Sequence, residues 1–422
     1  MGSNGTNPPY QANAILDSWE TKPLVRVAGY VTNKIPASLI DSRKYISTEN
    51  MLPYKGGITA SEGVPRNGKI TKFSSGDILI SNIRTYFEKI WYARFDGGCS
   101  TDVLAIRANE GIIQQFLYYY LSQDSFFEYT VRTSKGTKMP RGDKNAIMNF
   151  LTNVPPPEEQ KAITKILSDL DSKIELNQQM NKTLESIAQS IFKHWFIDFE
   201  FPNEQGKPYR SSGGEIVDSE LGKIPDGWTV KKLGEVGSFK NGVNYVKGEN
   251  GDGEFYITNV RDISNGKFLL KESLDRVKLD INKAREYLLD DKDIIIARSA
   301  CPGEVSLIVD GSNDVIYSGF SIRFRSNVPN NWMYMFLTFR HLKKQLITFS
   351  IGTTLTSVNQ QTLKNMKFVL PSDIVMKNFN ITIDSIFNRV FSNSVESLML
   401  SRTRDSLLPR LMSGMIRVPL ES

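Results

Sequence analysis

The chain has 422 residues, of which 40% are apolar, so it can build the cores of two or three ordinary domains. Lysine and arginine outnumber aspartate and glutamate by 52 to 46, and the net charge of +6 suits a polyanionic partner without demanding one. The two cysteines, Cys99 and Cys301, and the two histidines, His194 and His341, exclude a disulfide framework and a metal site rich in these residues.

The sequence carries no signal for a membrane. No apolar run approaches the roughly 20 residues that a spanning helix needs. The first residues, MGSNGTNPPYQ, lack the charged and then apolar pattern of a signal peptide. We therefore expect a cytoplasmic protein that makes no contact with a membrane.

Residues 1–154 have the pattern of a globular domain of mixed α and β structure. Short stretches rich in valine, isoleucine and aromatic residues alternate with glycine and asparagine, which predicts strands joined by tight turns. A helix is expected at about residues 114–132, and a loop rich in glycine and threonine follows it. The predicted strands are residues 24–32, 70–73, 77–81, 90–95 and 103–107.

A long helix is expected in residues 155–197. Three prolines, with Glu158 and Glu159 after them, form a start signal. The residues that follow form a heptad seam, which predicts a helix roughly 50 Å long at about 1.5 Å per residue. The seam positions are Ile163, Leu167, Leu170, Ile174, Asn177, Asn181, Leu184, Ala188, Ile191 and Trp195.

The chain then repeats itself. Residues 198–227, rich in glycine, proline and serine, are expected to link to a second globular domain, residues 228–370. Asp77, Gly136 and Pro155 each have a counterpart 216 residues later, and this constant offset through some 130 residues indicates a duplication. The second domain is expected to have strands at residues 256–259, 293–298, 305–309 and 320–325, and a helix near residues 332–348.

A second long helix, residues 371–413, repeats the seam with its polar break at Asn393. Two helices with matching seams are expected to pack against each other, antiparallel; the alternative is that each packs on its own domain. The seam is less regular at Ser397 and Arg404, and Pro409 puts the last turns in doubt. The seam positions are Phe379, Ile383, Ile386, Val390, Asn393, Ser397, Leu400, Arg404, Leu407 and Leu411.

Several segments resemble one family. They are Glu158-Glu159-Gln160, residues 192–196 (FKHWF) and 198–202 (DFEFP), residues 47–53 (STENMLP), residues 76–79 (GDIL) and Gly352-Thr353-Thr354. Together with the repeat, they resemble the specificity subunits of type I restriction-modification enzymes over nearly the whole chain. The resemblance implies an α+β fold, in which two homologous mixed α/β target-recognition domains are separated by two long helices packed as an antiparallel coiled coil.

The resemblance also implies a function. Each target-recognition domain would read one half of a bipartite, asymmetric site in double-stranded DNA, and the helices would set the spacer length and dock two methyltransferase subunits and the restriction subunits. A rigid rod between two readers of the major groove makes the half-site distance a structural constant. The chain itself is expected to catalyse nothing and to bind no cofactor or metal, with S-adenosylmethionine and ATP on the partner subunits.

The candidate DNA-binding residues are polar and basic side chains of the predicted loops. Arginine and lysine can reach guanine edges or phosphates, asparagine and glutamine can reach adenine, and threonine and serine can hold the backbone. The run from Lys135 to Arg141 is the strongest candidate. The full set is Lys55, Arg66, Lys69, Lys72, Arg84, Lys135, Thr137, Lys138, Arg141, Lys144, Lys240, Asn241, Asn244, Tyr245, Lys247, Arg261, Arg298, Thr353, Thr354, Thr356, Ser357 and Gln360.

Two other functions stay open. Asn7-Pro8-Pro9-Tyr10 matches the adenine-binding loop of N6-adenine methyltransferases, so the chain could methylate DNA alone, although no glycine-rich cofactor loop accompanies it. A coiled-coil adaptor that does not bind DNA is the other alternative. Asp77 and Asp293 could be taken for a catalytic pair, but a role in a turn or at the start of a strand is favoured.

Overall fold

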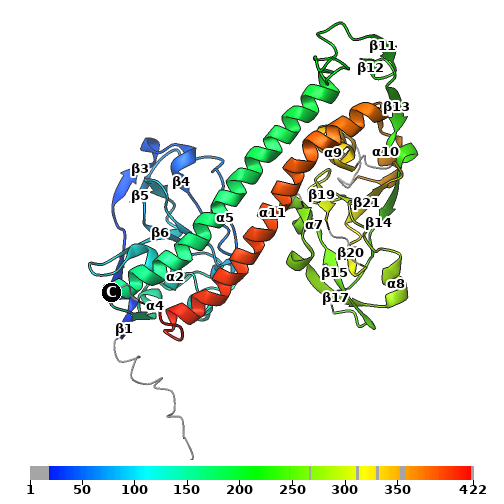
Figure 1. The fold of residues 1–422 in the computed structure, drawn as a ribbon. Coiled ribbons are helices and arrows are strands. Elements are labelled where there is room, and N and C mark those ends of the chain that lie inside the picture. Colours follow the sequence, from blue (N-terminus) through cyan, green and yellow to red (C-terminus); the bar gives the residue numbers. More distant parts are fainter. Residues whose placement is uncertain are drawn as a thin grey trace, which may run out of the picture. The chain divides into compact units, whose positions relative to one another are not determined.

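The computed structural model describes residues 19–246, 248–265, 268–309, 313–328, 332–351 and 358–419. The chain forms two compact units, the first ending at Ile174 and resuming at Met399, and the second running from Glu175 to Leu398. The two long helices, α5 (Pro157–Phe192) and α11 (Asp373–Met412), therefore each contribute one part to each unit (Figure 1).

The first unit contains a domain with two four-stranded sheets. One sheet has the order β2 (Ala28–Tyr30), β9 (Val103–Ala108), β6 (Ile78–Ser81), β7 (Ile90–Tyr92), with all neighbours antiparallel. The other has the order β3 (Lys34–Pro36), β5 (Lys69–Phe73), β8 (Gly97–Cys99), β4 (Tyr45–Ile46). A ribbon of β1 (Glu20–Pro23) and β10 (Leu151–Val154) closes the domain next to α5.

Two predictions for this domain, one strand and one helix, were wrong in detail. The expected strand at residues 24–32 begins with one helical turn, α1 (Leu24–Val27), because a turn buries both Leu24 and Val27 on one face, whereas a strand would separate them. The expected helix at residues 114–132 is two helices, α2 (Gln114–Leu121) and α3 (Asp124–Arg132), with α4 (Lys144–Met148) after them. The hydroxyl of Ser122 donates to the Tyr118 carbonyl at 2.7 Å and helps to end α2.

The domain of the second unit repeats this order with additions. Its five-stranded sheet has the order β14 (Gly237–Asn241), β21 (Ser321–Ser326), β18 (Ile294–Ala297), β19 (Val305–Ile308), β16 (Phe268–Leu269). The first four strands correspond to β2, β9, β6 and β7. A three-stranded sheet has the order β17 (Asp275–Leu279), β15 (Gly253–Thr258), β20 (Val315–Tyr317), and the closing ribbon is β13 (Thr229–Lys232) with β22 (Lys367–Leu370). The helices are α6 (Leu233–Val236), α7 (Val260–Asn265), α8 (Ile281–Arg285), α9 (Trp332–Ile351) and α10 (Gln360–Asn365).

The segment expected as a linker is itself folded. After the π-helical turn Lys193–Ile197, it forms a hairpin of β11 (Ile216–Ser219) and β12 (Gly222–Pro225). Phe201 stacks on Tyr209 at 4.5 Å between ring centroids and on Trp228 at 5.0 Å. These aromatic residues anchor the segment to the core of the second unit. The glycine and proline content of the segment had suggested a linker instead.

In the first unit, the beginning of α5 packs against the end of α11. Ile163 and Leu167 share an apolar cluster with Leu408, Leu411 and with α2 residues. Arg404, the irregular seam residue, donates to Asp171 at 2.7 Å, and the Tyr119 hydroxyl donates to the other oxygen of Asp171 at 2.7 Å. Burial lowers the pKa of Arg404, but the hydrogen bonds and charge of Asp171 outweigh it and raise that pKa.

The last turns of α11 are helical, so the doubt that Pro409 raised was misplaced. Proline removes one helical hydrogen bond, at a cost of about 3 kcal/mol. Leu408, Leu411 and Met412 are buried around it, and each buried side chain contributes about 1.5–3 kcal/mol. The helix therefore continues to Met412 because its packing outweighs the lost hydrogen bond.

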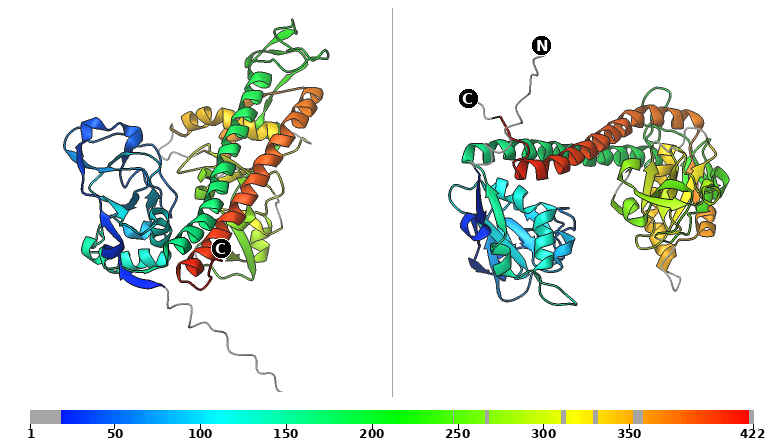
Figure 2. Two further views of the ribbon diagram at one scale, coloured as in Figure 1. Left: turned by 60° about the vertical axis from the view of Figure 1, so that its left-hand side comes forward. Right: turned by 90° about the horizontal axis from the view of Figure 1, so that it is seen from below.

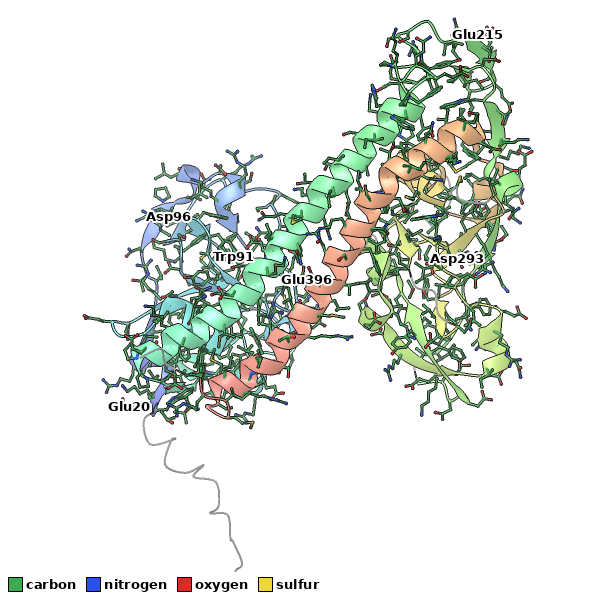
Figure 3. The ribbon with its side chains drawn as sticks, viewed as in Figure 1. Glu20, Trp91, Asp96, Glu215, Asp293 and Glu396 are labelled. Atoms are coloured by element: carbon green, nitrogen blue, oxygen red, sulfur yellow. The ribbon has the colours of Figure 1, made fainter. Side chains whose placement is uncertain are left out.

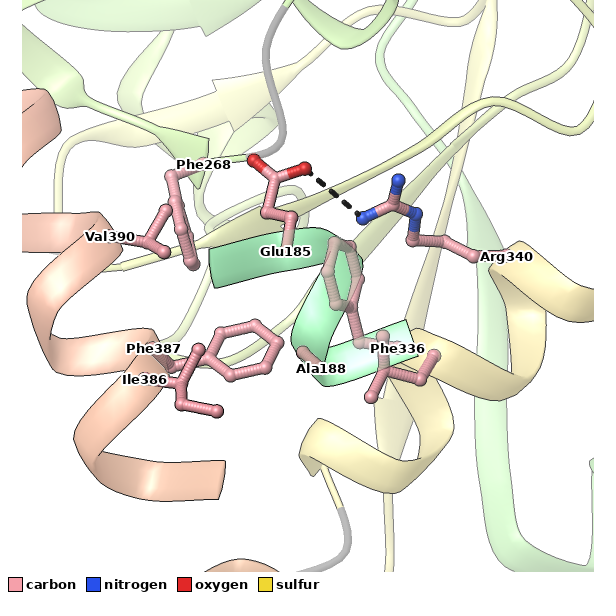
Figure 4. A pocket seen from close by; sticks show the side chains of 9 residues that line it. Glu185, Ala188, Phe268, Phe336, Arg340, Ile386, Phe387 and Val390 are labelled. Carbon is pink, nitrogen blue, oxygen red and sulfur yellow. Dashed lines mark ion pairs between the residues drawn. The ribbon is translucent and has the colours of Figure 1, made fainter. Parts of the chain in front are cut away.

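In the second unit, the remainder of α5 packs against the beginning of α11, again antiparallel (Figure 2). Ala188 and Phe192 share the core with Phe379, Ile383 and Phe387. Between α5, α9 and α11 lies a small apolar pocket, where Glu185 and Arg340 form an ion pair at 3.8 Å between nitrogen and oxygen (Figure 4). Each helix thus packs both on the other helix and on a globular domain, so the two packing alternatives are both partly realised.

The polar break of the seam forms a hydrogen-bonded layer within the second unit. Asn177 and Asn393 are 0% and 1% exposed. Asn393 Nδ2 donates to Asn181 Oδ1 at 2.9 Å, and Asn177 Nδ2 donates to Glu396 Oε2 at 2.8 Å (Glu396 is labelled on α11 in Figure 3). Offset by one heptad, these groups would face apolar residues, so the layer favours one register.

Replacing Asn393 by alanine is expected to lower the free energy of unfolding by about 1–2 kcal/mol, because the partly buried Asn181 oxygen loses its donor. Urea unfolding followed by circular dichroism measures this. Asn388→Ala, at an exposed position of the same helix, should change stability by less than about 0.5 kcal/mol. Equal losses in the two variants would contradict a role for the polar layer.

Among the described residues, every helix is too short or too polar to cross a lipid bilayer.

Candidate nucleic-acid interface

In the first domain, one sheet edge gathers several of the predicted residues. After β6 the chain turns at Arg84, whose φ of +50° is in the left-handed region. The Arg84 amide donates to the Pro140 carbonyl at 2.8 Å, and the Gly142 amide donates to the Asn82 carbonyl at 3.1 Å. These bonds hold the basic loop, residues 135–141, beside the end of β6.

The basic loop is a small hairpin. Lys135 and Arg141 exchange backbone hydrogen bonds of 2.8 and 2.9 Å, and Gly136 supplies the positive φ of +94° that the turn requires. Asp143, two residues after the loop ends, caps α4 through the amides of Asn145 and Ala146. The hydrogen bond from Lys135, together with the two amides, lowers the pKa of Asp143. The loop is therefore held at both ends, with its side chains exposed: Lys135, Thr137, Lys138, Arg141 and, on α4, Lys144.

The charges of this edge are only partly neutralised. Lys135 pairs with Asp143, and Arg141 pairs with Asp102 at 3.2 Å. Among the described residues, no carboxylate oxygen lies within 4.0 Å of a side-chain nitrogen of Arg84 or Lys138, which is the distance limit for an ion pair. These two cations are available to an anionic partner without breaking an ion pair.

The remaining candidates of the first domain lie elsewhere. Lys55 is held by Glu88 at 3.3 Å and Asp124 at 2.6 Å, which weakens the prediction that it contacts DNA. Lys69 and Lys72 are exposed on β5 in the other sheet, and Arg66 is exposed in the loop before it. The structure does not bring these four residues into the cluster around the basic loop.

The second domain repeats the arrangement at the same edge. Arg298 follows β18; its amide donates to the Phe320 carbonyl at 3.0 Å, and its carbonyl accepts from Val358 at 3.0 Å. Ala300, 216 positions after Arg84, likewise has a left-handed φ of +62°. The backbone framework that presents the basic loop is therefore duplicated together with the sheet.

Asn244 and Tyr245 lie near this second framework. The Gly319 amide donates to the Val243 carbonyl at 2.8 Å, which brings the exposed Asn244 next to the turn between β20 and β21. The Tyr245 hydroxyl donates to Asn259 Oδ1 at 3.2 Å. Asn244, Arg298 and the turn thus form the part of the second edge that is free to meet a ligand.

Other candidates of the second domain have contacts within the protein. Lys240 pairs with Glu286 at 3.1 Å, and Arg261 pairs with Asp275 and Asp262. The Gln360 side chain bonds the backbone of β14, with its oxygen 3.0 Å from the Asn241 nitrogen. The predicted residues Lys247, Thr353, Thr354, Thr356 and Ser357 lie outside the described residues.

Asp77 and Asp293 have the role at the start of a strand that the sequence favoured. Arg107 forms two hydrogen bonds to Asp77, at 2.7 and 2.8 Å, and Arg325 forms two to Asp293, at 2.8 and 2.5 Å (Asp293 is labelled in Figure 3). Burial raises the pKa of Asp293, and the hydrogen bonds from Arg325 oppose that shift. Each carboxylate is hydrogen bonded to an arginine of the neighbouring strand, so both aspartates have a structural role.

The structure also shows residues that the sequence did not single out. Arg417 and Trp19 both donate to the buried Glu159, the arginine to Oε2 at 2.7 Å and the indole at 2.9 Å. Phe320 lies at the position of the second domain that corresponds to Asp102 when the two-residue insertion is counted, and this alignment could have identified it. Clusters of histidine, cysteine or carboxylate side chains suited to a metal ion are absent from the described ranges.

Comparison with known proteins gives the same organisation. A family model described as the type I restriction modification DNA specificity domain matches the chain twice, over residues 17–186 and 225–377. The MjaIX type I restriction enzyme specificity subunit of Methanocaldococcus jannaschii is 29% identical over 322 residues, which cover 73% of this chain and 70% of the relative. The HindI specificity subunit of Haemophilus influenzae is 25% identical, covering 95% of this chain and 100% of the relative.

A solved structure shares the fold. The crystal structure of the S subunit of a type I restriction-modification system from M. genitalium covers 93% of this chain and 96% of its own, with a TM-score of 0.55 at 13% sequence identity. The two matched segments of the family model each contain one globular domain and reach into the long helix that follows it. The comparisons therefore agree with a duplicated domain and paired helices.

Proposed function

Because the chain belongs to the family of type I restriction modification DNA specificity domains, we propose that it is the subunit that selects the DNA target of such an enzyme. The observation that carries this proposal is the duplicated sheet edge. Two equivalent backbone frameworks, around Asn82 and Arg298, each present polar or basic side chains to solvent. Two such edges suit two separate contacts with double-stranded DNA.

The two edges differ in chemistry, so the two half-sites differ in sequence. Arg84 corresponds to Ala300, and Lys144 corresponds to Gln360. Lysine and arginine favour phosphates and guanine, whereas a smaller or neutral side chain does not. The target is therefore bipartite and asymmetric.

The paired helices supply the second part of the proposal. They set the length of the unread spacer and dock two methyltransferase subunits, with restriction subunits joining the same assembly. The chain catalyses nothing itself; S-adenosylmethionine and ATP are bound by the partner subunits. Its contribution to the reaction is to place the methyltransferase on the chosen DNA sequence.

The test is to map the methylated adenines in the genome of a host that expresses this chain with its methyltransferase subunits, and to footprint the purified complex on one mapped site. We expect one recurring motif of two specified parts around an unspecified spacer, and two separated regions of protection. A single contiguous motif, or no DNA-dependent protection, would defeat the proposal.

The purified chain and its complex also distinguish the two alternative functions. Methyl transfer from S-adenosylmethionine by the chain alone would identify an adenine methyltransferase; its candidate loop, residues 7–10, lies outside the described residues. A complex that assembles but has no affinity for DNA would identify an adaptor. The exposed cations Arg84 and Lys138 favour neither alternative.

A further inference from the structure

One position differs strongly between the two sheet edges. In the first domain, the Asp102 carbonyl accepts from the Asn82 amide at 2.8 Å; in the second, the Phe320 carbonyl accepts from the Arg298 amide at 3.0 Å. The two residues therefore occupy the same place in the duplicated framework. Asp102 carries a charge that pairs with Arg141, whereas Phe320 is a large apolar side chain.

Phe320 is exposed without a structural reason in its own domain. Its relative exposure is 65%, whereas its neighbours Ser318 and Ser321 are 1% and 0% exposed. Leaving a phenylalanine in water forgoes about 1.5–3 kcal/mol of burial. The turn is nevertheless well held, since the Gly319 amide and the Ser321 hydroxyl are both hydrogen bonded, at 2.8 Å each.

An amide side chain lies beside the glycine that precedes this phenylalanine. A Cβ atom added to Gly319 would come within 2.2 Å of Asn244 Oδ1, so the Asn244 amide packs against the glycine that precedes Phe320. An asparagine amide matches the adenine edge in the major groove, and an apolar side chain matches the thymine 5-methyl group on the other base of the same pair. The two side chains together fit an A·T pair.

We propose that Phe320 reads a thymine in the half-site of the second domain by contact with its 5-methyl group, with Asn244 beside it on the paired adenine. This inference rests on the proposed function and deepens it, because it names the base pair that one edge selects. Asp102, at the equivalent place in the first domain, offers no apolar surface to a methyl group. The difference between the two domains at this position contributes to the asymmetry of the target.

The test uses the complex with its methyltransferase subunits and duplexes that carry the mapped site. Each thymine is replaced in turn by deoxyuridine, which lacks only the 5-methyl group. We expect one replacement to weaken binding of the wild-type complex about fourfold, the factor for burial of one methyl-sized group. The same replacement should leave the Phe320→Ala complex unchanged.

A matched control and a second variant keep the test decisive. Leu39→Ala removes another exposed apolar side chain, 72% exposed in the first domain, and should respond to deoxyuridine as wild type does. Phe320→Leu keeps an apolar contact and should restore part of the response. The inference is overturned if no thymine replacement depends on Phe320, if the half-site contains no A·T pair, or if Phe320→Ala weakens all duplexes equally.

The result also separates this inference from the proposed function. If the wild-type complex methylates no two-part motif, the proposed function fails. If it methylates such a motif while every deoxyuridine response is the same in wild type and Phe320→Ala, only the role of Phe320 fails.

Discussion

Replacing Lys138 and Arg141 together by alanine is expected to weaken DNA binding of the assembled complex by about tenfold to a hundredfold. Both residues are exposed on the basic loop, which is anchored to the end of β6 by backbone hydrogen bonds. If both contact phosphates, the slope of log K against log salt should become shallower by about 1.8, since each phosphate contact contributes about 0.9. Fluorescence anisotropy on a labelled duplex at several salt concentrations measures both quantities.

The control for this prediction comes from the same domain. Arg26, in α1, and Arg94, after β7, are also exposed, but the strand register places them near the start of β6, whereas the basic loop lies beside its end. Arg26→Ala with Arg94→Ala removes the same charge and should leave both the affinity and the salt slope near their wild-type values. If the two double variants lose the same affinity, net charge rather than the basic loop governs binding. If neither loses affinity, the loop is outside the interface.

The duplication was the most informative property of the sequence, because a constant offset survives even where side chains differ. It correctly predicted two related domains and two long antiparallel helices. It could not predict the folded hairpin at residues 216–225, because the glycine and proline content that suggests a linker is also the content of tight turns. Nor could it predict the break between α2 and α3, where the Ser122 hydroxyl donates to the Tyr118 carbonyl and competes with the backbone hydrogen bonds of the helix.

Prediction of the site from the sequence was less complete, for a different reason. Composition shows that a cation is present, whereas the tertiary structure decides whether a carboxylate already neutralises it. Lys55, Lys240 and Arg261 are each paired with at least one acid that is 14 to 69 positions away in the chain. A single sequence carries no signal for such long-range pairs. The sequence favoured the run that contains Lys138 and ranked Arg84 with the other cations. Only the structure shows that no described carboxylate pairs with either side chain.

The sequence posed helix pairing and packing on the domains as alternatives, and the structure combines them. In the first unit Ile163 lies with Phe116 of α2 and with Leu411 of α11; in the second unit Phe192 lies with Tyr334 of α9 and with Phe379 of α11. Each globular core therefore continues into the helical pair. Such shared cores couple the fold of each domain to the pairing of the helices within its unit.

Phe379→Ala is the variant that should reveal this coupling most strongly. Phe379 is 0% exposed and contacts Phe196 at 4.7 Å and Trp195 at 5.7 Å between ring centroids. Loss of a buried phenylalanine costs about 3–5 kcal/mol, which for a unit of this size lowers the melting temperature by about 10 °C. Differential scanning calorimetry of the full chain measures the shift.

Ile381→Ala is the matched control, because Ile381 lies two positions further along the same helix but is 68% exposed. It should lower the melting temperature by no more than about 2 °C. If the helix formed no part of the core of the second unit, the two variants would melt alike. If the helix forms part of that core, Phe379→Ala should lower the melting temperature of the second unit. The melting temperature of the first unit should not change, because Phe379 contributes to the apolar core of the second unit alone.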